Sequence, residues 1–114
     1  MRSMEFQIAN GDLGSYYALG PITVNDGVYF VPAAEQHENE VGTWNIVEVF
    51  VYGNDSVQLV NGHPVVRVTG ATLVENDDVR PLKRGKIQLQ SESMEIYFRA
   101  VTIEPIAAIP PALR

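Results

Sequence analysis

The sequence contains no cysteine, so neither a disulfide framework nor a thiolate metal site can form. Basic residues are also scarce: the chain has 8 Lys and Arg against 14 Asp and Glu, which gives a formal net charge of −6 at pH 7. A nucleic-acid-binding protein needs a basic surface to displace counterions from phosphates, so we expect no nucleic-acid partner. No apolar run approaches the roughly 20 residues of a membrane span, and no signal-peptide core is visible near Met1.

Short alternating runs of apolar and polar residues make up most of the chain, and turn residues such as Asn61-Gly62 separate them. Such alternation predicts strands with one apolar face. The expected strands are Met4–Ala9, Ser15–Leu19, Val28–Val31, Thr43–Tyr52, Ser56–Val60 and His63–Thr69, followed by a long loop over Gly70–Arg84 with a brief extended piece at Thr72–Val74. With no amphipathic helix, the pattern indicates an all-β antiparallel sandwich or jelly roll.

The stretch Gly85–Glu104 is predicted to form a hairpin that turns at Ser91–Ser93. In each strand apolar and polar residues alternate, so each has one apolar and one polar face. The polar faces carry Gln88, Gln90 and Glu92 on the first strand and Glu95, Tyr97 and Arg99 on the second. Together with Glu5 and Gln7 of the first expected strand, these side chains either line a binding groove or form an ordinary solvated outer face.

Aromatic residues offer a second set of candidates. Trp44, Phe50 and Tyr52 share one face of an expected strand and could stack on a sugar ring, although such a stripe more often packs against a neighbouring sheet. Tyr16 and Tyr17 point to opposite faces, so at most one of them can reach a groove.

Candidate metal ligands are few. His37 and His63 are the only histidines, and neither has a ligand partner at a useful spacing, so surface positions are expected for both. Asn76-Asp77-Asp78 offers the oxygen donors that calcium prefers, but adjacent polar residues of this kind are also typical of a loop. We therefore expect no metal and no cofactor.

Several of these pieces, in order, resemble one known family. They are Glu5-Phe6-Gln7-Ile8, Gly42-Thr43-Trp44-Asn45, Gly53, Asn61-Gly62, the run from Gly85 to Glu92, and Tyr97-Phe98-Arg99. The sequence is similar to the 3-keto-disaccharide hydrolase domain, a former domain of unknown function with a concanavalin- or glucanase-like jelly roll. The resemblance implies a sandwich over residues 1–105, a Pro-rich tail over 106–114, and a chain that matches the carboxy-terminal part of a longer domain.

The resemblance further implies a hydrolase that acts on glycosides oxidised at C3. A ketone at C3 acidifies the C2 proton, so a carboxylate can remove it, and elimination followed by hydration completes a net hydrolysis. In that scheme Glu5 or Glu92 is the base and Arg99 or Gln90 faces the enolate oxygen. The substrate-binding candidates are Gln7, Gln90, Tyr97 and Tyr17.

The same sequence features are compatible with other functions. Paired-carboxylate glycosidase chemistry is less favoured, and a non-catalytic carbohydrate-binding module or a structural sandwich would use the same scaffold. The hydrolase, glycosidase and binding-module interpretations each imply a carbohydrate ligand. Family members are often exported, which implies a secreted or periplasmic location. If strands bordering the sheets are absent, exposed edges invite pairing into a homodimer.

Overall fold

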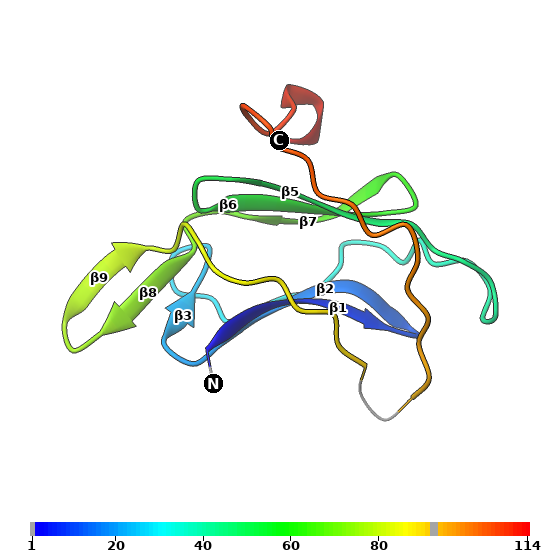
Figure 1. The fold of residues 1–114 in the computed structure, drawn as a ribbon. Helices are drawn as coiled ribbons and strands as arrows, with labels where there is room; N and C mark the ends of the chain where they lie inside the picture. Colours follow the sequence, from blue (N-terminus) through cyan, green and yellow to red (C-terminus); the bar gives the residue numbers. More distant parts are fainter. Residues whose placement is uncertain (1, 92–93) are drawn as a thin grey trace.

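The computed structural model describes residues 2–91 and 94–114, and regular structure in this part of the chain is almost entirely β (Figure 1). The strands are β1 (Ser3–Ala9), β2 (Asp12–Leu19), β3 (Ile22–Thr23), β4 (Phe30–Val31), β5 (Val47–Tyr52), β6 (Asp55–Val60), β7 (His63–Val68), β8 (Thr72–Glu75) and β9 (Asp78–Pro81). A short 3₁₀ helix, η1 (Pro111–Leu113), follows near the carboxy terminus. None of the helical residues described is part of a helix long and apolar enough to span a membrane.

The strands form three sheets of three strands each, with the orders β1-β2-β4, β3-β8-β9 and β5-β6-β7. Every pairing within them is antiparallel. Short hairpins join β1 to β2, β5 to β6 and β6 to β7, and each turn contains a glycine with positive φ: Gly11, Gly53 and Gly62. The turn residues therefore determine which neighbouring strands pair as hairpins, as Asn-Gly and similar signals predict.

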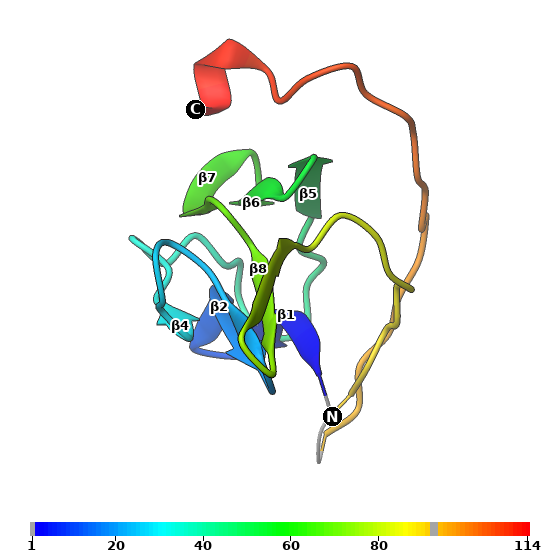
Figure 2. The ribbon, with the colours of Figure 1, turned by 90° about the vertical axis from the view of Figure 1, so that its left-hand side faces the viewer.

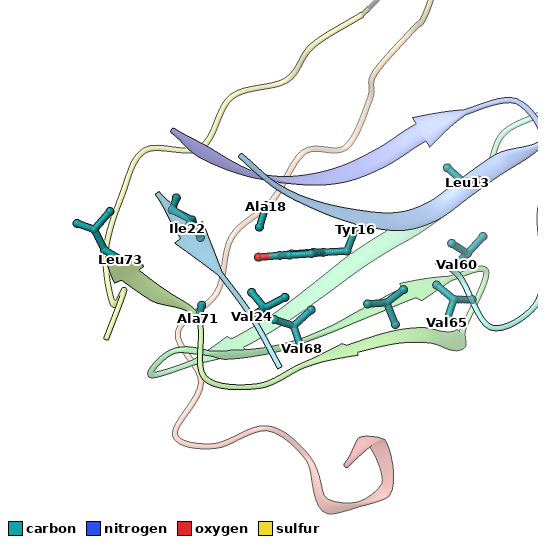
Figure 3. Close-up of a cluster of buried hydrophobic side chains, with 11 residues drawn as sticks. Leu13, Tyr16, Ala18, Ile22, Val24, Val60, Val65, Val68, Ala71 and Leu73 are labelled. Atoms are coloured by element: carbon teal, nitrogen blue, oxygen red, sulfur yellow. The ribbon is translucent and has the colours of Figure 1, made fainter. Parts of the chain in front are cut away.

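The main core lies between the sheets β1-β2-β4 and β5-β6-β7, which stack face to face (Figure 2). Tyr16 of β2 extends between the layers toward Val68 of β7, and Val60 of β6 lies farther along the same interior (Figure 3). The remaining buried members are Leu13, Ala18, Ile22, Val24, Val65, Val66, Ala71 and Leu73. Burial of these side chains supplies the main stabilisation of the sandwich, at roughly 25 cal/mol for each Å² of apolar surface removed from water.

A β-bulge interrupts the ladder between β1 and β2. Phe6 pairs with Tyr16 but Ile8 pairs with Leu13, so Gly14 and Ser15 together face the single residue Gln7. Gly14 has a φ of +110°, and a Cβ built there would lie 2.7 Å from Cγ2 of Val65. Glycine is therefore required at position 14 for two reasons: the backbone has a positive φ, and the opposite sheet leaves no room for a Cβ.

The outer face of the β5-β6-β7 sheet carries a second, smaller apolar cluster. Val57 and Leu59 of β6 pack there against Ile109, with Phe50 and Leu113 at the margin. The segment before η1 crosses over this sheet to reach these positions (Figure 1). The Pro-rich tail therefore packs against the outer face of the sandwich.

The all-β antiparallel prediction is confirmed, and the two stacked sheets form a small, incomplete β-sandwich. The jelly-roll connectivity stays a prediction. The predicted hairpin over 85–104 is wrong for the described residues, since 82–91 and 94–110 contain no strand and the proposed turn lies partly outside the described chain. The expected loop over Gly70–Arg84 instead contains the β8–β9 hairpin. Alternation reveals which face of a segment is apolar, but it does not reveal whether a partner strand is within reach.

Candidate functional site

A row of three side chains crosses the outer face of the β1-β2-β4 sheet. Glu5 of β1 is the ladder partner of Tyr17 of β2, and Tyr17 is the ladder partner of Phe30 of β4. Directly opposed residues share a face, and this face is the outer one because the neighbouring Tyr16 enters the core. The rings of Tyr17 and Phe30 lie 4.7 Å apart between centroids. A carboxylate, a phenol and a half-exposed aromatic face therefore lie side by side toward solvent.

Asp12 ties this row to the start of β2. Its Oδ2 accepts a hydrogen bond from the Tyr17 hydroxyl at 3.3 Å, and its Oδ1 accepts one from Ser15 Oγ at 2.5 Å. Ser15 Oγ in turn accepts a hydrogen bond from the backbone N–H of Ala33. Partial desolvation, the charge of Asp12 and the hydrogen bond to it all raise the pKa of Tyr17 above its ordinary value. A phenol is protonated at neutral pH even at its ordinary pKa, and the raised pKa extends that protonated range to higher pH, so the Tyr17 hydroxyl can act as a donor.

The bulge explains how Asp12 and Tyr17 meet. Residues five apart on a regular strand point to opposite faces. The extra residue at Gly14-Ser15 reverses that parity, so both side chains lie on the outer face. Bulges often redirect side chains next to functional sites, and this one also brings Ser15 within reach of the same carboxylate.

The other predicted site residues do not join this row. Gln7 lies at the bulge, Gln90 is exposed in the strand-free segment, and Tyr97 is 71% exposed with its hydroxyl donating to Glu95. The Glu95 hydrogen bond, followed by desolvation, raises the pKa of Tyr97. Glu92 lies outside the described residues. The structure therefore brings together Glu5 and Tyr17 among the candidates, and the roles of all of them remain predictions.

Arg99 is held elsewhere, above the ring of Trp44. Its guanidinium carbon lies 4.0 Å from the ring centroid, a cation–π distance. Trp44 belongs to the loop before β5, which Asn61 anchors: Asn61 Oδ1 accepts from the N–H of Ile46, and Asn61 Nδ2 donates to the carbonyl of His37. The positive φ of Asn61 (+49°) suits a residue of the turn between β6 and β7. This arrangement fixes where Arg99 can reach.

The two histidines lie together, which their separation in sequence did not predict. The rings of His37 and His63 stack with centroids 3.9 Å apart and planes inclined by 8°, and His37 Nε2 lies 3.1 Å from Glu35 Oε2. Within residues 2–91 and 94–114, no group of three or more His, Cys, Asp or Glu side chains is arranged to hold a metal ion. Asn76 and Asp77 adopt positive φ and form the tight turn between β8 and β9, which explains their polar character.

A pocket of about 230 Å³ lies away from this row, on the outer side of β6 and β7. Ile109, Arg67 and Arg114 contribute to its lining. The chain itself uses both arginines, because Arg67 Nε donates to the carbonyl of Leu113 and Arg114 Nε donates to the carbonyl of Ile109. These hydrogen bonds occupy the arginine side chains in holding the tail. The pocket therefore has fewer polar groups available to a ligand than the outer face of β1-β2-β4.

Comparison with known families adds one finding. The model of the 3-keto-alpha-glucoside-1,2-lyase-like domain matches residues 1–104 of the 114-residue chain. The chain belongs to this family. No curated protein and no solved structure matches it significantly. Membership in the 3-keto-alpha-glucoside-1,2-lyase-like family supports a carbohydrate-related, hydrolase-like role.

Sequence reasoning missed Phe30, a member of the row, and Asp12, which accepts a hydrogen bond from Tyr17. Asp12 reads as a turn residue beside Asn10-Gly11, and Phe30 as one residue of a short apolar strand. The available signal was Gly14, because a glycine inside an otherwise regular strand suggests a bulge. A bulge at that position would have predicted that Asp12 and Tyr17 share a face.

Proposed function

We propose that the outer face of the β1-β2-β4 sheet binds a glycoside carrying a ketone at C3 and cleaves it by elimination and hydration. The observation that carries the proposal is the in-register row of Glu5, Tyr17 and Phe30. It joins a carboxylate that can act as a base, a phenol that can donate a hydrogen bond to the developing oxyanion and an apolar ring face on which a sugar can stack. The family description, which names a lyase acting on a 3-keto-alpha-glucoside, supports the same chemistry.

In the first step Glu5 removes the proton from C2 of the sugar. The electron pair of the C2–H bond moves into the C2–C3 bond, and negative charge develops on the C3 oxygen. When the C3 carbonyl re-forms, a C1–C2 double bond appears and the C1–O bond breaks. Glu5 returns its proton to the departing oxygen. Water then adds across the double bond, with hydroxide at C1 and a proton at C2, which completes a net hydrolysis.

In this scheme Tyr17 stabilises the negative charge that develops on the C3 oxygen. Its phenol is protonated at neutral pH, as an ordinary phenol is, so it can donate a hydrogen bond to the C3 oxygen as the enolate forms. Asp12 positions the hydroxyl in the free protein through the 3.3 Å hydrogen bond. Phe30, 43% exposed, offers a ring face on which the sugar can stack. Glu92 remains the alternative base, and Arg99 and Gln90 remain candidate donors for the same oxygen.

The test is release of 3-keto-glucose from a 3-keto-disaccharide by the full chain. Glu5→Gln should lower kcat by about 10² to 10⁴-fold, the usual contribution of a general base. Tyr17→Phe should lower it by about 10²-fold, as loss of one oxyanion donor does. Glu48→Gln, an exposed acid on β5, is the matched control and should leave turnover unchanged.

Full activity of Glu5→Gln would contradict the assignment of the base, and loss of activity in Glu92→Gln would then move the role to Glu92. Absence of turnover by the wild-type chain would contradict the catalytic proposal as a whole.

A binding module is the second candidate, and the Tyr17–Phe30 ring pair favours it because stacking on a sugar needs no reactive group. This alternative predicts saturable binding without turnover, weakened by Phe30→Ala and unchanged by Glu5→Gln. Titration calorimetry with the same sugar separates the two functions.

A further inference from the structure

The exposed edges of the three sheets differ in how well they are protected against pairing with another chain. Natural edge strands are blunted by bulges, prolines, charges or short length. β1 carries the charge of Glu5 and lies opposite the bulge of β2, which increases the local twist. β7 contains Pro64 and a register shift, and β9 combines Asp78, Arg80 and Pro81 within four residues. β3 and β4 have two residues each. Each of these edges is a poor template for an added strand.

β5 is the exception among the described edges. It pairs with β6 over all six residues without a register shift, and its sequence VEVFVY contains no proline and a single charge, that of Glu48. Its other side has no ladder partner in the described chain. An extended, regular and mostly apolar edge of this kind is an open template for β-strand addition.

Three valines of β5 point toward the interior of the sandwich and yet remain exposed. Val49 aligns with Gln58 of β6, which aligns with the core residue Val66 of β7. Val49 therefore lies on the core-facing side, and the alternation places Val47 and Val51 there as well. Their exposed fractions are 43%, 48% and 52% for Val47, Val49 and Val51. The facing sheet leaves this margin of the apolar interior uncovered.

We propose that this edge binds a second copy of the chain, which adds its own β5 antiparallel across a two-fold axis. The sequence of β5 is complementary to itself in one register. With Val49 opposite Val49 of the partner subunit, Val47 pairs with Val51 of the partner subunit, and all three valines meet valines. β-Branched cross-strand pairs stabilise such a ladder. A shift that centres the axis on Glu48 would place like charges opposite each other, which is unfavourable.

Residues 85–91 and 94–108, which contain no strand, supply further contact area on the same side. They pass outside β1 and β5 without pairing with either (Figure 2). Their exposed apolar side chains include Ile87, Leu89, Met94, Phe98, Val101 and Ile103. Added to those of the three valines, the exposed fractions of these six side chains equal about five whole side chains, or about 500 Å² of apolar surface at roughly 100 Å² each. Since apolar atoms form a little over half of an interface, burial of all of this surface would correspond to about 900 Å² per copy. A standard complex buries about 800 Å² per partner.

Sedimentation of the full chain from about 1 μM to about 1 mM tests the proposal. The mass should rise from 12.6 kDa to twice that value as the concentration increases. Val49→Lys places a charge in the centre of the edge and should weaken association at least tenfold. Val79→Lys introduces the same change on the β9 edge, where Val79 is 65% exposed, and should leave association unchanged. Far-UV circular dichroism checks that both variants are folded.

Cross-linking tests the register without relying on affinity. The chain has no cysteine, so any disulfide in a single-cysteine variant joins two copies. Opposed residues of an antiparallel pair lie about 4.5–5.5 Å apart between Cα atoms, within the range of a disulfide. Val49→Cys should therefore oxidise to a covalent dimer much faster than Val79→Cys. A wild-type chain that stays monomeric, an association unaffected by Val49→Lys, or equal oxidation of the two variants would overturn the proposal.

Discussion

Substitution of Gly14 by alanine should destabilise the sandwich through two separable effects. Gly14 has a φ of +110°, where an L-residue is strained by about 1–3 kcal/mol. A Cβ at this position would also lie 2.7 Å from Val65 Cγ2 and 3.3 Å from Val60 Cγ2. Overpacking of that kind costs about 1–3 kcal/mol, because β6 and β7 must move away from β2. Together the two effects should remove about 2–6 kcal/mol from the free energy of unfolding, a large part of the roughly 5–15 kcal/mol of a typical domain.

Gly27 provides the matched control, since its φ is also +110° but no atom lies within 4 Å of the Cβ that alanine would add. Gly27→Ala should therefore show the backbone strain alone. Urea unfolding followed by circular dichroism gives both free energies. The difference between the two variants should be about 1–3 kcal/mol, which measures the close approach of the sheets. Equal destabilisation by the two substitutions would refute the stacking of β2 against β6 and β7 at this point.

Two further substitutions test the core and the loop before β5. The hydroxyl of Tyr16 is buried without a hydrogen-bond partner in the described chain, so Tyr16→Phe should raise the free energy of unfolding by about 1 kcal/mol in urea titrations. Burial raises the pKa of Tyr16 above 10.0, so the folded state holds this proton more tightly than the unfolded state does. The contribution of Tyr16 to stability should consequently be constant up to about pH 10 and be lost above it, so stability should fall less steeply above pH 10 in the variant; an identical slope would contradict the burial of the hydroxyl. Asn61→Ala removes three side-chain hydrogen bonds to the loop and strains a residue at φ +49°, so it should cost about 3 kcal/mol in thermal or urea unfolding. Asn10→Ala in the exposed β1–β2 turn should cost less than about 1 kcal/mol.

Local signals in the sequence were sufficient for most of the sandwich. β1, β6 and β7 lie within one residue of the predicted ranges, because alternation and adjacent glycine turns are properties of neighbouring residues. The strand predicted over Thr43–Tyr52 begins only at Val47, since Asn61 binds the backbone of Ile46 and holds the preceding loop away from the sheet. That contact links residues 15 apart and has no local signature.

The candidate site depended more strongly on contacts between distant residues. Glu5 and Tyr17 were named from the sequence, but their direct opposition follows from the register of β1 and β2. Asp12 joined them only through the bulge at Gly14, and Phe30 only through the pairing of β2 with β4. Conversely, the polar face expected over 85–104 was inferred from alternation alone. Since no neighbouring strand pairs with that segment in the described chain, Arg99 packs on Trp44 instead.

Cleavage of a 3-keto-disaccharide in D₂O tests the central claim most directly. Elimination and hydration through Glu5 predict that newly released 3-keto-glucose carries deuterium at C2 in the wild-type reaction, faster than in the sugar incubated without protein. Mass spectrometry at early times should show this label, and Glu5→Gln should neither release the product nor exchange the C2 proton of the substrate. Released sugar that retains hydrogen at C2, or a Glu5→Gln variant that exchanges at the wild-type rate, would contradict the account.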